Sequence, residues 1–238
     1  MYKIIEFQSL PSTNLYIKEN YRSLANKTVV MANHQTAGRG RRGRVWQDSD
    51  DLLFSILLKK NLPESITNLS LLMAASLYKT LIKKVENVTI KWPNDILVNG
   101  KKLAGILLES VINAGKTEYV VIGVGINTNT EEIDASLQDK ATSLYLETKA
   151  KVNKKELLRK IIRGFSEEYK LYNEGKSDYL QICRHHSSVI GREVTIIINN
   201  AQKTAKIVDI LSNGNISLMV DDQQIEMNSG EITLTELY

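Results

Sequence analysis

The most unusual segment of the chain is a basic loop, GRGRRGR at residues 38–44. Its glycines permit backbone shapes that other residues resist, and they leave N–H groups open to an anion. Its arginines supply planar guanidinium groups that match carboxylate and phosphate oxygens. The segment therefore predicts a site for a reaction that gathers several anions, such as a carboxylate and a triphosphate. A solvated basic loop and an RNA contact of the RGG kind are the alternatives that this segment alone leaves open.

A second polar cluster is KWPND at residues 91–95. Pro93 keeps the residue before it out of the helical region, so a strand must turn here. Asp95 could bind a metal or orient a lysine, and the alternative is a capped turn with a surface carboxylate. Lys102 follows shortly, at the start of an apolar run. A lysine on a strand that enters the core can steady a ligand's negative charge, whereas an edge-strand lysine only deters aggregation.

The third cluster is GVGIN at residues 123–127, which closes an apolar strand. Glycine in a strand lets another backbone or a flat ring come close. Asn127 offers a donor and an acceptor together, which is what reading an adenine edge requires. The dinucleotide fingerprint needs a third glycine, and no complete Gly-x4-Gly-Lys-Ser/Thr loop is present. An ATP site here must therefore be of another kind.

These clusters fall between elements that predict an α+β fold. Asn99-Gly100 indicates a tight hairpin, because a type I′ turn needs positive φ twice. Asn153 with Glu156 resembles a capping box that opens a helix. The patterns predict strands over residues 3–8, 28–32, 52–58, 88–91, 96–98, 103–108 and 119–126, and helices over 12–21, 66–85, 141–146 and 153–172. From 193 to 237 short strands without a helical period predict a small β-barrel or β-sandwich.

The composition sets outer limits on function. The formal net charge of the 238 residues is +4, which by itself is too small to indicate a nucleic-acid partner. Cys183 is the single cysteine, so no internal disulfide can form, and a reducing, cytoplasmic location is expected. No apolar run approaches the roughly 20 residues needed to span a bilayer, and the start lacks signal-peptide features. His185 and His186 lie near Cys183, but too few ligands accompany them to predict a zinc site.

Together, the motifs resemble the biotin–protein ligase family. The matching segments, in order, are STN at 12–14, QTAGRGRRGR at 35–44 with Trp46, KWPND at 91–95, KLAGI at 102–106 and GVGIN at 123–127. The resemblance implies a mixed β-sheet flanked by helices, the class II synthetase-like catalytic fold, over residues 1–187. It also implies a small SH3-like β-barrel over 188–238, where SGEI at 229–232 carries the likeness.

The resemblance further implies a two-step reaction. Biotin and ATP, with Mg²⁺, give biotinyl-5′-AMP, and the lysine of a biotin carboxyl carrier protein or domain of a carboxylase then attacks it. The implied catalytic residues are Lys102, Arg39 and Arg41. The implied biotin-binding residues are Ser12, Thr13, Asn14, Gln35, Arg39, Gly40, Arg41 and Lys102. The implied ATP and adenylate residues are Arg39, Arg41, Arg42, Trp46, Asn94, Lys102 and Asn127, with Asp95 as a candidate metal ligand.

Some members of the family carry an N-terminal winged helix that binds DNA. Because the STN motif begins only 11 residues after Met1, we expect a ligase without repressor activity or DNA binding. A homodimer stays an open alternative to a monomer. Two rival functions remain to be compared: a lipoate or octanoate ligase or transferase, which shares the catalytic fold, and a nucleic-acid-binding module that uses the arginine loop.

Overall fold

The computed structural model describes residues 2–47, 49–198 and 201–228. A seven-stranded sheet with the order β1-β2-β3-β7-β6-β5-β4 forms its centre. β1 and β2 run parallel and the other neighbours run antiparallel, so the sheet is mixed, as predicted. The strands are β1 (Lys3–Leu10), β2 (Thr28–Gln35), β3 (Leu52–Leu58), β4 (Val88–Lys91), β5 (Asp95–Val98), β6 (Lys101–Asn113) and β7 (Lys116–Ile126).

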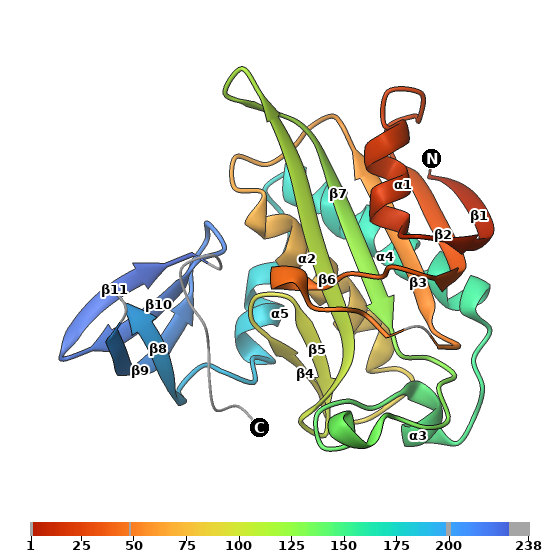
Figure 1. Ribbon diagram of the computed structural model, residues 1–238. Helices are drawn as coiled ribbons and strands as arrows, with labels where there is room; N and C mark the ends of the chain where they lie inside the picture. The colour runs from red at the N-terminus through yellow and green to blue at the C-terminus, as the bar shows by residue number, and fades with distance from the viewer. Residues whose placement is uncertain (1, 48, 199–200, 229–238) are drawn as a thin grey trace.

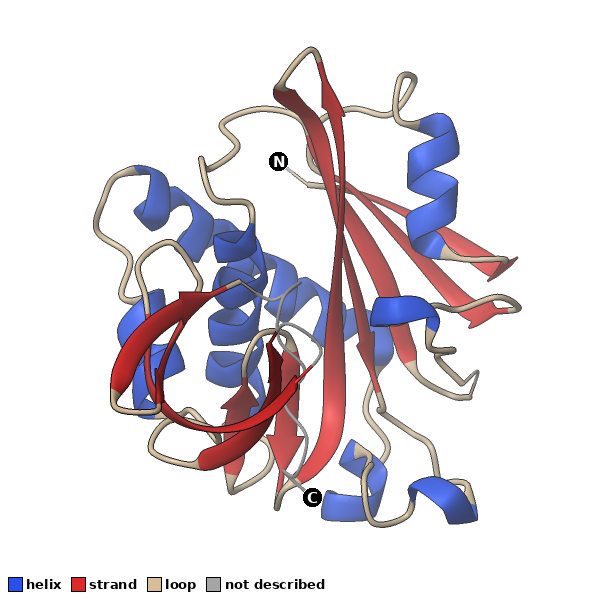
Figure 2. Cartoon of the chain, turned by 60° about the vertical axis from the view of Figure 1, so that its left-hand side comes forward, coloured by secondary structure: helices blue, strands red, loops and turns tan. Residues whose placement is uncertain are grey.

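Helices cover the two faces of this sheet unequally, as Figures 1 and 2 show. One face carries α2 (Thr67–Leu81), with α4 (Lys154–Asn173) and α5 (Tyr179–His185) packed against it. The other face carries α1 (Thr13–Asn20), which contacts β2, β3 and β7. The basic loop crosses this second face in front of β6 and β7 (Figure 1). The loop and α1 therefore lie on the same side of the sheet. No described helix combines the length and apolarity needed to cross a membrane.

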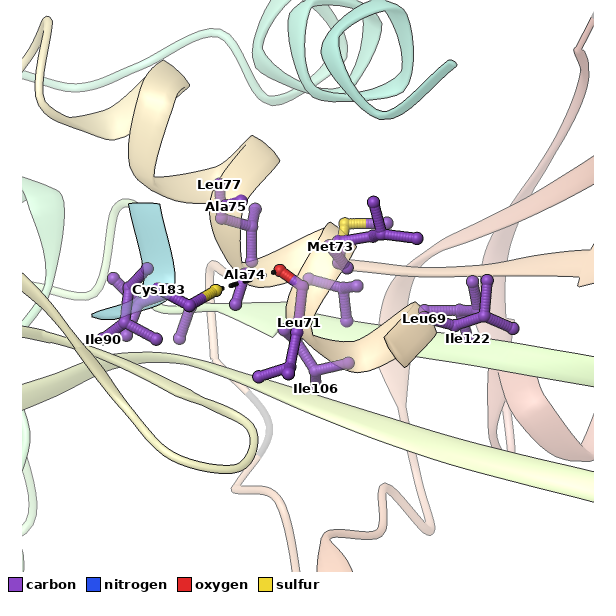
Figure 3. Close-up of a cluster of buried hydrophobic side chains, with 14 of the residues drawn as sticks. Leu69, Leu71, Met73, Ala74, Ala75, Leu77, Ile90, Ile106, Ile122 and Cys183 are labelled. Carbon is purple, nitrogen blue, oxygen red and sulfur yellow. Dashed lines mark hydrogen bonds between the residues drawn. The ribbon is translucent and has the colours of Figure 1, made fainter. Parts of the chain in front are cut away.

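The main core lies between the sheet and α2. Figure 3 shows Leu69 and Leu71 of α2 in one buried cluster with Ile122 and Ile106 of the sheet. The thiol of Cys183 on α5 donates to the carbonyl oxygen of Leu71 at 3.5 Å. Burial raises the pKa of this thiol to about 12, so it stays protonated near neutral pH. The single cysteine is thus a packing residue that joins α5 to α2.

Several local predictions are confirmed and others need correction. Asn99 and Gly100 have φ values of 50° and 80°, as a type I′ hairpin requires. The helix expected over 66–85 ends at Leu81. The helix expected over 141–146 is α3 (Leu144–Thr148), because Ala141 forms a bridge with Lys102 and Ser143 caps the helix. The short helix α5 was not predicted, since seven residues show too little periodicity.

The C-terminal part is a separate antiparallel sheet of four strands. Its order is β11-β10-β9-β8, formed by β8 (Glu193–Ile198), β9 (Ala201–Ile210), β10 (Ile216–Val220) and β11 (Gln223–Met227). The described residues contain no closed barrel, and the SGEI motif at 229–232 lies outside them, so barrel closure stays a prediction. The domain boundary at 187/188 also stays a prediction, because a single hydrophobic cluster includes both Cys183 and Val194.

Candidate active site

A pocket lies on the α1 side of the sheet, between the first turn of α1, the basic loop and the middle of β6 and β7. Most of the side chains singled out in the sequence meet in its wall. They are Ser12, Thr13, Asn14, Gln35, Arg39, Gly40, Arg41, Trp46, Asn94 and Lys102. Residues from four distant parts of the chain therefore share one cavity, which none of the motifs could establish alone.

One end of the pocket is a buried network of neutral polar groups. Ser12 caps α1 by accepting from the backbone N–H of Leu15, which starts the helix beside the pocket. The backbone N–H and the hydroxyl of Thr13 both donate to Oε1 of Gln35, at 2.7 and 3.0 Å. The Ser55 hydroxyl lies 2.6 Å from Oγ1 of Thr13 and 2.5 Å from Oδ1 of Asn14. Such a network can recognise a neutral ring that offers both donors and acceptors.

The other end of the pocket is cationic. Nη1 of Arg41 donates to Oδ1 of Asn94 at 2.9 Å, so the loop is tied to the turn between β4 and β5. Nζ of Lys102 lies 2.8 Å from Oδ1 of Asp95, so this carboxylate is placed to orient the lysine. Burial is the main reason that the pKa of Arg41 is lowered, and the charge of Arg42 adds to it. Two partly desolvated cations on one wall favour an anionic ligand.

Trp46 lies flat over the glycines of the sheet. A Cβ added to Gly125 would lie 2.7 Å from the Trp46 indole, and one added to Gly105 would lie 3.1 Å from it. The expectation that glycine at this strand admits a flat ring is therefore confirmed, with the tryptophan as that ring. Nζ of Lys102 is 5.7 Å from the ring centroid, close enough for a cation–π contact. The glycines make a slot that fits a planar group.

Other sequence-predicted residues lie away from the pocket wall. Arg42 is exposed and has a φ of 56°, at the tip of the loop. Asn127 donates through Nδ2 to the carbonyl oxygen of Thr142 at 2.8 Å, so its amide holds the 140–144 segment to the sheet. Among the described residues no group of three or more His, Cys, Asp or Glu side chains could hold a metal ion. The ATP roles of Arg42 and Asn127 stay predictions.

Two polar residues of this site, Ser55 and Glu109, were not predicted from the sequence. Ser55 is fully buried, and its signal was a lone hydroxyl inside the apolar strand LLFSILL. Glu109 accepts from Nδ2 of Asn14 at 2.7 Å, and its signal was a charge placed directly after the apolar run of β6. Both signals are visible in the sequence, but their partners are 41 and 95 residues away. Only the fold shows what they contact.

The mixed sheet, with a polar and cationic pocket under a glycine-rich loop, forms a domain whose pocket suits a small molecule with anionic groups. The sequence profile of the "Biotin/lipoate A/B protein ligase family" matches residues 4–127, more than half of the 238-residue chain. The chain belongs to this family.

Individual relatives agree with that placement. The Bacillus subtilis protein named "Bifunctional ligase/repressor BirA" is 32% identical over 214 residues, covering 87% of this chain and 66% of the relative. The Mycobacterium tuberculosis "Biotin--[acetyl-CoA-carboxylase] ligase" is 28% identical and covers 86% of this chain and 77% of the relative. A Bacillus spizizenii relative is matched over only 46% of its length. The chain therefore spans two thirds or less of these two Bacillus relatives.

The solved structures include a match over the full length. The biotin protein ligase of Aquifex aeolicus in complex with biotin and ATP superimposes with a TM-score of 0.86 at 30% identity. The alignment covers 99% of this chain and 99% of the Aquifex chain. The C-terminal sheet is therefore included in the structural likeness.

Proposed function

We propose that this chain is an ATP-dependent biotin–protein ligase. It joins biotin to ATP as biotinyl-5′-AMP and pyrophosphate, and then transfers biotin to a lysine of a carrier protein. The observation that carries the proposal is that a neutral polar network and a cationic wall lie in the same pocket. A buried neutral network from Ser12 to Ser55 suits the ureido ring, and the cationic wall at Arg41 and Lys102 suits the reacting anions. The Aquifex relative, whose structure was solved in complex with biotin and ATP, supports it.

In the first step the biotin carboxylate must approach the α-phosphorus of ATP although both are negative. Lys102, Arg39 and Arg41 line the pocket and would neutralise the charge where the new bond forms. Holding both substrates in one geometry supplies much of the remaining rate. The basic loop over the pocket would shield the adenylate from water until the carrier lysine attacks. Trp46 over the glycine slot suits the adenine side of ATP.

Magnesium fits this site as a partner of the ATP phosphates. Mg²⁺ is usually held by one or two carboxylates together with substrate phosphates and water. Asp95 is the carboxylate beside Lys102, so it is the residue that would contribute a ligand. The ion would offset phosphate charge, while Lys102 and Arg41 act on the reacting oxygens.

The decisive experiment is exchange of labelled pyrophosphate into ATP by the purified chain, with biotin, lipoate or octanoate as the added acid. We expect exchange with biotin, and exchange with lipoate or octanoate alone would overturn the proposal. Labelling of a biotin carboxyl carrier domain by the chain then tests the second step. A nucleic-acid module is disfavoured, because Arg41 is turned toward Asn94 in the pocket wall.

Three further expectations belong to this proposal. The partner is the carrier protein or domain of a biotin-dependent carboxylase, and the location is the cytoplasm, which the single reduced cysteine supports. We also expect this chain to act without binding DNA, and a gel shift with duplex DNA tests this.

The oligomeric state stays open between a monomer and a homodimer. Sedimentation velocity with and without biotin plus ATP decides between them.

A further inference from the structure

The side-chain amide of Asn14 is held from both sides in the neutral half of the pocket. Its Nδ2 donates to Oε2 of Glu109 at 2.7 Å, and its Oδ1 accepts from the Ser55 hydroxyl at 2.5 Å. An ionised carboxylate only accepts hydrogen bonds, so Glu109 fixes which end of the amide carries the nitrogen. A Cβ added to Gly123 would lie 2.3 Å from Oδ1 of Asn14, so the amide also presses against β7.

This fixed amide sets the direction of the next hydrogen bonds. The Ser55 hydroxyl has one proton, and Oδ1 of Asn14 is an acceptor that needs it. Oγ1 of Thr13, 2.6 Å from the Ser55 hydroxyl, is a second acceptor that competes for the same proton. The Thr13 hydroxyl itself donates to Oε1 of Gln35, 3.0 Å away. From Ser55 through Asn14 to Glu109 the hydrogen bonds therefore run in one direction, and Glu109 is the charged end of this chain.

Glu109 is itself held by Lys18. Its second oxygen, Oε1, lies 2.6 Å from Nζ of Lys18, and the two side chains are 32% and 33% exposed. Glu109 is not among the residues that line the pocket, whereas Thr13, Asn14 and Gln35 are. The carboxylate thus acts on a ligand through Asn14 and does not contact the ligand.

We propose that Glu109 is a positioning residue that sets the donor and acceptor pattern with which this pocket recognises the ureido ring of its substrate. The inference rests on the proposed function and adds a residue to it. Without the carboxylate, the Asn14 amide can turn over, Ser55 can donate to Thr13 instead, and the pocket presents the wrong pattern. The effect is confined to the neutral end, because the cations at Arg41 and Lys102 belong to a separate set of hydrogen bonds.

The test uses three single variants and two ligands in direct calorimetric binding. Glu109→Met removes the acceptor at similar length, Glu109→Gln retains one acceptor oxygen, and Lys18→Met removes only the outer partner of Glu109. We expect Glu109→Met to weaken biotin binding about tenfold or more, as losing a correctly paired buried group does. The affinity of Glu109→Gln for biotin should lie between those of Glu109→Met and the native chain. The affinity of Lys18→Met should stay within about threefold of the native value, because an exposed ion pair contributes little.

The second ligand is 2-iminobiotin, in which an imino group replaces the ureido carbonyl oxygen. We expect the native chain to prefer biotin strongly, and Glu109→Met to reduce this preference while the KM for ATP in the exchange assay stays unchanged. If Glu109→Met binds biotin with native affinity, the proposed role of Glu109 is wrong. It is also wrong if the variant loses biotin binding and ATP binding equally. A native chain that binds lipoate and not biotin overturns the proposed function itself, and the two failures are therefore distinguishable.

Discussion

Nζ of Lys102 lies 2.8 Å from Oδ1 of Asp95, and the same carboxylate oxygen accepts from Nδ2 of Asn94 at 3.0 Å. Asn94 also binds Arg41 through its Oδ1. One short turn between β4 and β5 therefore restrains both a lysine and an arginine of the cationic wall. The KWPND segment positions the site through these contacts.

Replacing Lys102 by methionine tests the cationic wall. We expect biotin-dependent pyrophosphate exchange to fall by about 10²–10³, the usual effect of removing one preorganised group at developing charge. The free energy of unfolding should change by less than about 1 kcal/mol, because the ion pair with Asp95 is partly exposed, at 31% and 17%. Lys101→Met is the matched control, since Nζ of Lys101 donates to the surface carbonyl oxygen of Gln138. If Lys102→Met exchanges pyrophosphate at the native rate, this lysine has no role in the first step.

The local features of this site could be predicted because each is written in neighbouring residues. Asn99-Gly100 makes its hairpin, and Asn153 caps α4 by accepting from the backbone N–H of Glu156 at 3.1 Å. The glycines of β7 were expected to admit a flat ring, and Trp46 lies there. Short-range turn and cap chemistry is decided by the residues themselves, so the sequence carries it.

The long-range features could not be predicted in the same way. The contact of Asn14 with Glu109 joins residues 95 apart, and that of Arg41 with Asn94 joins residues 53 apart. Such pairs depend on strand order and on which face each side chain takes, and a shift of one residue reverses the face. Asn127 illustrates this limit: its amide donates to the carbonyl oxygen of Thr142, a contact that its neighbours in the chain did not indicate, while its adenine role stays a prediction.

Gly125→Ala tests the slot under Trp46. The added Cβ would lie 2.7 Å from the indole, so the ring must move, and such overpacking typically costs about 1–3 kcal/mol. We expect the KM for ATP to rise about tenfold or more and biotin binding to change little, with an altered tryptophan fluorescence spectrum. Gly164→Ala is the control, because its Cβ would meet only Thr80 at 3.9 Å and alanine favours a helix. Unchanged fluorescence and unchanged ATP dependence in Gly125→Ala would place Trp46 elsewhere in solution.

Gly214→Ala tests the docking of the C-terminal sheet. The carbonyl oxygen of Gly214 accepts from Nε1 of Trp92 at 3.0 Å, beside the turn that restrains the cations. Gly214 has a φ of 84°, and an added Cβ would lie 2.8 Å from Oδ1 of Asn68. We expect a loss of unfolding free energy greater than the about 1–2 kcal/mol that positive φ costs alanine, together with slower exchange. Urea denaturation and the exchange assay measure the two effects.

Gly191→Ala is the matched control for that variant. Its φ is 82°, nearly the same, but nothing lies within 4 Å of the added Cβ. The difference between the two variants therefore separates the contact with Asn68 and Thr67 from the backbone strain. Equal losses of stability in Gly191→Ala and Gly214→Ala, with exchange unaffected in both, would contradict a role for this contact in positioning the site.

Asp51 provides the pH-dependent prediction. Its carboxylate is 2% exposed and accepts from the backbone N–H of Thr128 and the hydroxyl of Thr130, at 3.1 and 2.6 Å. Burial raises its pKa, against the smaller opposite effect of these hydrogen bonds. The folded state then binds the proton more tightly than the unfolded chain, so the stability that Asp51 contributes is present at low pH and is lost as the pH rises through its raised pKa. Asp51→Asn keeps an acceptor oxygen without the charge. The stability of this variant relative to the native chain should therefore be greater at pH 7 than at pH 4. Urea titrations of both proteins across this range measure the difference, and a relative stability that instead grows in acid would show that the carboxylate is stabilised in its charged form.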